Sequence, residues 1–203
     1  MSYIRTFSGV KFYPLDPNPA DVLIEDIAHA LSRLCRWVGH VPVEQYSVGL
    51  HSMHVCDLVG PNLNHQLAAL LHDASEAYLG DIAKPVKVLL PDYKVAENRL
   101  MACISQALGF EFPLPEIVHQ ADAAALFIEA KAFSKHADED IEYVHPPHIC
   151  FWPLDYFVGI PPSIVEDEFL AHYKKIKQNI HNEKTPRTIA VDSGNRDLVR
   201  VSG

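Results

Sequence analysis

The chain has 203 residues, of which 48% are hydrophobic and 21% are charged, and its formal net charge at pH 7 is −9. This composition is ordinary for a soluble globular protein, and the length allows one compact domain with a hydrophobic core. The acidic balance argues against broad binding to nucleic acid or to a membrane, because both need a basic face. No apolar run has the length of a membrane span, and the N-terminus has no signal-like region, so we expect a cytoplasmic protein.

The first half of the chain predicts a short strand and then helices. Residues 10–13 are expected to form a strand or hairpin arm, because the surrounding prolines exclude a helix. Apolar residues then recur at helical spacing and predict three helices. Their expected ranges are about 24–38, 43–59 and 65–78, followed by a short helix or loop over 81–91.

The second half of the chain predicts three more helices, over about 93–108, 116–134 and 163–182, the last with Ser163 as N-cap. A proline-rich irregular excursion over 135–162 interrupts them. We therefore expect an all-α helical bundle formed by residues 1–183. A polar, mobile tail is expected over 184–203.

One apolar segment carries an unusual group of polar side chains. His72 and Asp73 are adjacent, and Glu76 and Asp81 follow within about two helical turns. Charged groups on an apolar helix are costly to bury without partners. A bound cation would provide one partner for all of them, so we interpret this segment as the centre of a metal-dependent active site.

Two further residues complete the expected metal site. His51 and Asp122 lie on other predicted helices, and helical bundles build metal sites from side chains on facing helices. With His72 and Asp73 they supply two imidazoles and two carboxylates. Such a donor set suits a divalent ion of zinc, cobalt, manganese, magnesium or iron. Glu76 is then in reach as a proton acceptor.

The order His, His-Asp, Asp resembles that of the HD-domain phosphohydrolase superfamily. The resemblance is closest to its YfbR-like branch, which includes 5′-deoxynucleotidases, OxsA-type nucleotide phosphohydrolases and the phage dATP triphosphohydrolases called DatZ. The segment 24–32 is similar to the opening helix of the OxsA and DatZ group. The other motifs that carry the resemblance are Arg36-Trp37, residues 46–52, residues 71–82 and Ala121-Asp122.

This resemblance implies roles for individual residues and an HD-domain fold. The implied metal ligands are His51, His72, Asp73 and Asp122, and the implied catalytic carboxylates are Glu76 and Asp81. The implied substrate-binding residues are Arg36 and Lys87 for phosphate, Trp37 for the sugar or base, and Pro85 for the base pocket.

The resemblance also implies an activity and partners. We expect a dATP or dNTP triphosphohydrolase that releases deoxynucleoside and triphosphate, or alternatively a 5′-deoxynucleotidase that acts on dNMPs. An alternative of another class is a non-catalytic, nucleotide-sensing protein. The expected partners are a small nucleotide and further copies of the chain, as a dimer or hexamer.

Two departures from the branch argue against strict dATP specificity. A basic residue is usual a few positions before the last Asp, and here that place holds His119 or Gln120. The residue two after Trp37 is Gly39, where DatZ proteins have a bulkier apolar group.

Simpler interpretations remain open for several of these residues. Asp122 could be a charge at a helix N-terminus, and Arg36 a charge at a helix C-terminus. Glu76 could be solvated, and Asp81 could cap the next segment. Trp37 could belong to the core or its rim.

Overall fold

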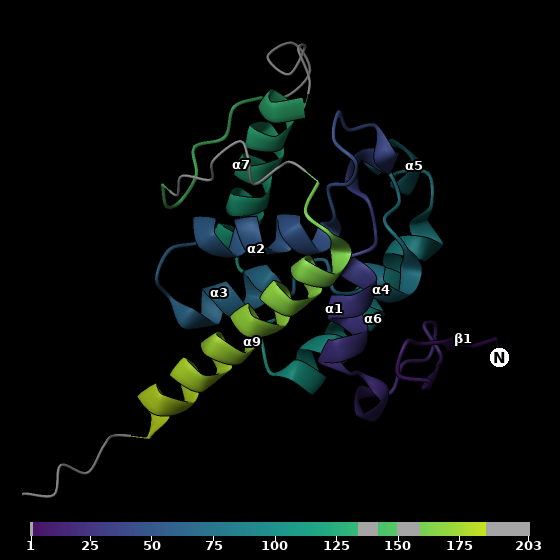
Figure 1. Cartoon of the computed structure of the whole chain (residues 1–203). Coiled ribbons are helices and arrows are strands. Elements are labelled where there is room, and N and C mark those ends of the chain that lie inside the picture. The colour runs from purple at the N-terminus through teal and green to yellow at the C-terminus, as the bar shows by residue number, and fades with distance from the viewer. Residues whose placement is uncertain (1, 134–141, 150–158, 186–203) are drawn as a thin grey trace, which may run out of the picture.

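The computed structural model describes residues 2–133, 142–149 and 159–185. It is predominantly helical, so the predicted all-α class is confirmed. Figure 1 shows the helices packed around one another. In chain order they are the 3-10 helix η1 (Pro19–Asp21), α1 (Ile24–Leu31), the 3-10 helix η2 (Arg36–Gly39), α2 (Val48–Leu58), α3 (Leu63–Leu70), α4 (Glu76–Leu79), α5 (Lys84–Lys87), α6 (Pro91–Leu108), α7 (Glu116–Phe133) and α9 (Pro162–Lys184).

Helix α2 lies in the middle of the bundle and contacts α1, α3, α7 and α9 (Figure 1). Of its residues only Asp57 is not buried, as expected of a helix with neighbours on every side. Gly49 allows α1 to approach closely, because a Cβ at this position would lie 3.2 Å from the backbone nitrogen of Ser32. The interior position of α2 places its side chains among those of the surrounding helices.

The strand predicted at residues 10–13 is confirmed. Strand β2 (Lys11–Phe12) pairs with β1 (Ile4–Arg5) in an antiparallel hairpin, with Ile4 opposite Phe12. The Phe12 ring is fully buried and stacks on Tyr78, with ring centroids 4.0 Å apart. The hairpin is therefore fixed to the helical core by an aromatic contact.

The predicted helix over 24–38 is wrong in its second half, because α1 ends at Leu31. After it the chain turns and pairs with a later segment: Cys35 forms an antiparallel bridge with Ser47, and the Arg36 nitrogen donates to the Tyr46 carbonyl at 2.8 Å. The same pairing delays the start of α2 from the predicted residue 43 to Val48.

The turn that follows is conformationally unusual. Trp37 and Val38 have φ angles of 58° and 52°, in the left-handed region that bulky and β-branched residues rarely adopt. The backbone at this turn therefore carries strain next to Arg36, one of the predicted site residues.

The predicted helix over 65–78 is divided into α3 and α4. Between them, backbone hydrogen bonds join residues three apart instead of the four of an α-helix. The His72 nitrogen donates to the Ala69 carbonyl, and the Glu76 nitrogen donates to the Asp73 carbonyl. The division leaves His72 and Asp73 in a turn rather than in a regular helix.

The later helices agree with the sequence except at the start of α9. Pro161 precedes that helix as its cap residue, so the predicted N-cap Ser163 lies inside it. The described parts of the excursion are residues 142–149 and 159–162. Residues 142–149 contain no helix and are tied to α2 by a hydrogen bond from the His148 nitrogen to the Leu58 carbonyl, and α9 begins at Pro162. The rest of the excursion and the predicted tail beyond residue 185 lie outside the described residues. None of the described helices is long and apolar enough to cross a membrane.

Ser47 caps α2, since its hydroxyl oxygen accepts a hydrogen bond from the Leu50 nitrogen at 3.1 Å. Replacing Ser47 by alanine is expected to lower the free energy of unfolding by about 1 kcal/mol, whereas Ser47→Gly is expected to cost only a few tenths. Urea unfolding of the two variants measures the difference. Equal losses in both variants would contradict a capping role.

Candidate metal centre

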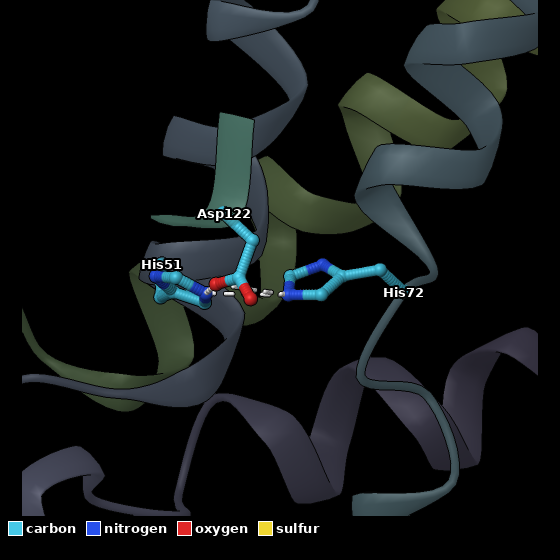
Figure 2. A group of neighbouring side chains, drawn as sticks. All are labelled: His51, His72 and Asp122. Atoms are coloured by element: carbon cyan, nitrogen blue, oxygen red, sulfur yellow. Dashed lines mark hydrogen bonds and ion pairs between the residues drawn. The ribbon is translucent and has the colours of Figure 1, made fainter. Parts of the chain in front are cut away.

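Three side chains from separate parts of the bundle form a cluster that could hold a metal ion: His51, His72 and Asp122. One donor atom from each residue lies within 4.8 Å of the other two. His51 Nε2 lies 3.2 Å from His72 Nε2 and 3.1 Å from Asp122 Oδ1. Figure 2 shows the Asp122 carboxylate between the two imidazole rings. Two imidazoles and a carboxylate fit a divalent transition ion, while its identity stays a prediction.

The fourth predicted ligand, Asp73, lies beside this cluster. Its Oδ2 is 3.1 Å from His72 Nε2 and 3.8 Å from His51 Nε2. His72 Nδ1 donates to the Ala69 carbonyl at 2.8 Å, so its Nε2 is the nitrogen that faces the carboxylates. The turn between α3 and α4 therefore both holds the His72 ring and brings Asp73 next to it.

The cluster is strongly coupled electrostatically. Burial opposes protonation of His72, but the Asp73 carboxylate outweighs it and raises the pKa of His72 to about 9. Burial also opposes ionisation of Asp73, yet the charge of His72 holds the pKa of Asp73 well below its usual range. For Asp122 the hydrogen bond to His51 likewise overcomes burial and lowers the pKa. Protonation of the imidazoles and ionisation of the carboxylates therefore favour each other within the cluster.

Metal binding is expected to depend on pH, because a proton on His72 competes with the cation for Nε2. Since the pKa of His72 is raised to about 9, the protonated form prevails below that pH. Each unit of acidification should then weaken the apparent affinity by about tenfold. Titrations with Co²⁺ between about pH 6.5 and 8 measure this slope. An affinity that is constant over this range would contradict the expected competition.

Arg36 reaches the cluster from η2. Its Nη1 lies 3.7 Å from Asp73 Oδ2, and its Nε lies 3.2 Å from Glu129 Oε2. Burial opposes its charge, but Glu129 and Asp73 outweigh that cost and hold the pKa of Arg36 above its usual range. Because Arg36 lies beyond the end of α1, it is not a charge at that helix's C-terminus.

Glu129, on α7, is a residue that the sequence interpretation missed. Its carboxylate is fully buried and contacts Arg36, Tyr46 and His51. A signal was available, because Glu129 follows Asp122 by about two helical turns and must therefore face the same side of α7.

Glu76 is buried at the start of α4 and is not solvated. Its Oε1 accepts from Lys87 Nζ at 3.1 Å, while no described residue hydrogen-bonds its buried Oε2. Burial raises the pKa of Glu76 to about 9, assisted by Asp73 and Asp81 and opposed by Lys87. A buried carboxylate oxygen without a partner is unusual and needs an explanation, and a catalytic role would provide one.

The simpler interpretations of two carboxylates also fail. Asp122 lies beyond the first turn of α7, too far along for a helix N-terminal charge. Asp81 is half-buried, and α5 begins after Ala83, so Asp81 does not cap it. Burial raises the pKa of Asp81, whereas the charge of Arg36 lowers it. Asp81 therefore interacts electrostatically with Arg36, which also contacts Asp73.

A cavity of about 310 Å³ adjoins the cluster. His72, Asp73 and Asp122 are among the residues that line it. Its other described lining residues combine an apolar wall with polar and charged groups: Ser75, Lys87, Lys94, Glu97, Asn98, Met101, Phe112, Pro113, Leu114 and His119.

Three of the four predicted substrate-binding residues do not line this cavity: Arg36, Trp37 and Pro85. Trp37 packs against the core, and its buried Nε1 has no hydrogen-bond partner among the described residues. Pro85 is exposed on α5. The fourth, Lys87, does line the cavity.

Comparison with known proteins identifies two similar bacterial chains. The uncharacterized protein YfdR of Escherichia coli is 41% identical over 131 residues, which cover 64% of this chain and 72% of YfdR. The uncharacterized protein RCAP_rcc00048 of Rhodobacter capsulatus is 39% identical over 134 residues, which cover 63% of this chain and 68% of RCAP_rcc00048. No family model matches the chain.

Proposed function

The chain belongs to the same family as YfdR of Escherichia coli, and from this premise and the geometry of the cluster we propose that it is a metal-dependent phosphohydrolase of deoxynucleotides. The observation that supports this most is the convergence of His51, His72 and Asp122 in one cluster with Asp73 beside it. Glu76 interacts with the charge of Asp73, and its buried Oε2 has no partner among the described residues. The resemblance of the same residues to the HD-domain superfamily gives further support.

His51, His72 and Asp122 would hold the cation, with Asp73 next to them. A divalent cation supplies Lewis acidity, polarising a phosphoryl oxygen and lowering the pKa of a water molecule. The donor set fits such an ion because both imidazoles present Nε2 to the carboxylates.

The chain's own residues perform the remaining tasks. Arg36 binds phosphate oxygens through its planar guanidinium. Glu76 accepts the proton of the attacking water in its ionised form, which the ammonium of Lys87, 3.1 Å from Glu76 Oε1, favours. Asp81 positions that water. The water oxygen bonds to the α-phosphorus while the bond to the 5′-oxygen breaks. The 5′-oxygen takes a proton from solvent and leaves as the nucleoside hydroxyl, and Glu76 returns the proton it accepted to solvent.

The leading substrate is dATP or another dNTP, which would give deoxynucleoside and triphosphate. A 5′-deoxynucleotidase is the second candidate, and one observation favours it. Lys87, the expected phosphate contact, is already ion-paired with Glu76 at 3.1 Å and with Glu97 at 2.9 Å. A longer phosphate chain would have to compete with these carboxylates.

One experiment tests the proposal. Metal-reconstituted protein is incubated with a panel of dNMPs and dNTPs, and the released phosphate species are identified by ³¹P NMR. Triphosphate from dNTPs supports the leading substrate, and orthophosphate from dNMPs only supports the second candidate. No turnover of any nucleotide, with thermal stabilisation by nucleotides, would identify a sensor and contradict the enzyme.

A further inference from the structure

Glu129 joins three side chains that belong to different parts of the site. Its Oε1 accepts from His51 Nδ1 at 2.5 Å and from the Tyr46 hydroxyl at 2.9 Å, and its Oε2 accepts from Arg36 Nε at 3.2 Å. The carboxylate is completely buried between α7, α2 and the segment before α2. A buried charge persists only when it is paired and hydrogen-bonded, and Glu129 meets both conditions.

The first contact determines which face His51 turns to the cluster. An imidazole that donates Nδ1–H to Glu129 presents Nε2 to the opposite side, where a cation would take the Nε2 lone pair in place of a proton. That side holds Asp122 Oδ1 at 3.1 Å and His72 Nε2 at 3.2 Å. Glu129 thus fixes both the orientation of the His51 ring and the nitrogen offered to a cation.

The contact between Glu129 Oε2 and Arg36 Nε determines which guanidinium nitrogens face the cluster. Guanidinium has donors along its Nε edge and at its two terminal nitrogens. Glu129 occupies the Nε donor, while Nη1 points toward Asp73 Oδ2 at 3.7 Å. Nη1 is therefore left on the side of the cluster, where a phosphate would lie.

We infer that Glu129 is a positioning residue that holds the metal ligand His51 and the phosphate-binding Arg36 in register with each other. The Arg36 half of this inference rests on the proposed function, whereas the His51 half requires only that the cluster binds a cation. Tyr46 supports the arrangement by donating to the same oxygen that accepts from His51.

A purely structural role makes a different prediction. If Glu129 served only to neutralise the buried Arg36, its replacement would lower thermal stability and leave the cation affinity of the folded protein unchanged. Affinity for a cation and stability of the cation-free protein therefore have to be measured separately.

The test uses full-length protein and Co²⁺ alone as the probe, followed by visible absorption, which reports the geometry of coordination. Glu129→Gln keeps the shape of the side chain and removes its charge. We expect its Co²⁺ affinity to fall about 10- to 100-fold, as on loss of other carboxylates that orient a ligating histidine. At saturating Co²⁺, its affinity for inorganic phosphate is expected to fall as well.

Asp26→Asn is the matched control. Asp26 is a buried carboxylate on α1 that accepts from the Ser8 nitrogen and hydroxyl, both at 2.7 Å, and belongs to no part of the cluster. Its replacement is expected to lower stability without changing Co²⁺ affinity.

Folded Glu129→Gln with Co²⁺ affinity within about twofold of the wild type would overturn the inference. If that variant does not fold, Glu129→Asp, which keeps the charge but shortens the reach, is tested by the same criterion. A protein that shows the Co²⁺ effect but hydrolyses no nucleotide would refute the proposed function and leave the role of Glu129 toward His51 intact.

Discussion

Replacing Glu76 by glutamine is expected to lower turnover by about 10²- to 10⁴-fold, the usual contribution of a general base. Glutamine has the same shape, yet it cannot accept the proton of the attacking water. The Glu76 carboxylate is buried, contacts Lys87 through one oxygen and has no described partner for the other. Binding of Co²⁺ should persist, because Glu76 is not one of the clustered ligands.

The measurement compares kcat and Co²⁺ affinity for Glu76→Gln and for Glu116→Gln. Glu116 is an exposed residue in the first turn of α7, so the same substitution there should leave both quantities unchanged. Retained turnover in Glu76→Gln, with metal still bound, would remove Glu76 from the mechanism.

Asp122→Asn is expected to abolish activity through the metal rather than through proton transfer. The substitution replaces a charged donor that lies 3.1 Å from His51 Nε2 by a neutral amide. Loss of a ligand should weaken cation binding by more than about 100-fold, beyond the effect of removing a supporting carboxylate.

Asp122→Asn is also expected to lose the stabilisation that a bound cation gives the folded protein. A cation that binds only the folded state adds about 2.7 kcal/mol at a concentration of about 100 times its Kd. Wild-type protein should therefore unfold at lower temperature after treatment with a chelator, and Asp122→Asn should no longer respond to added metal. Asp92→Asn, an exposed change on α6, is the control. A chelator effect that persists in Asp122→Asn would place the cation elsewhere.

Helix prediction succeeded where the sequence itself marks helix ends. Helix α6 stops at Gly109, which adopts the left-handed conformation that favours glycine. It failed where distant segments compete: residues 32–38 have helical spacing, but their backbone pairs with Tyr46 and Ser47 instead. Periodicity describes one segment at a time and cannot detect such a competition.

The residues of the cluster could be named from the sequence because histidine and aspartate on apolar helices are unusual. Glu129 is marked only by its spacing of about two helical turns from Asp122, a weak signal because glutamate inside a helix usually faces solvent. Its burial arises only when α7 packs on α2 and brings it to His51. The cavity wall at Phe112 and Leu114 was missed for the same reason, because it depends on how a loop meets α6.

The separation of the donors along the chain has a consequence for biosynthesis. His51 and His72 are made early, whereas Asp122 and Glu129 both belong to the later helix α7. A growing chain that has reached only α6 presents two imidazoles without the Asp122 carboxylate and without the support of Glu129. Tight capture of a cation must then await the docking of α7, so an interrupted translation product would not retain metal.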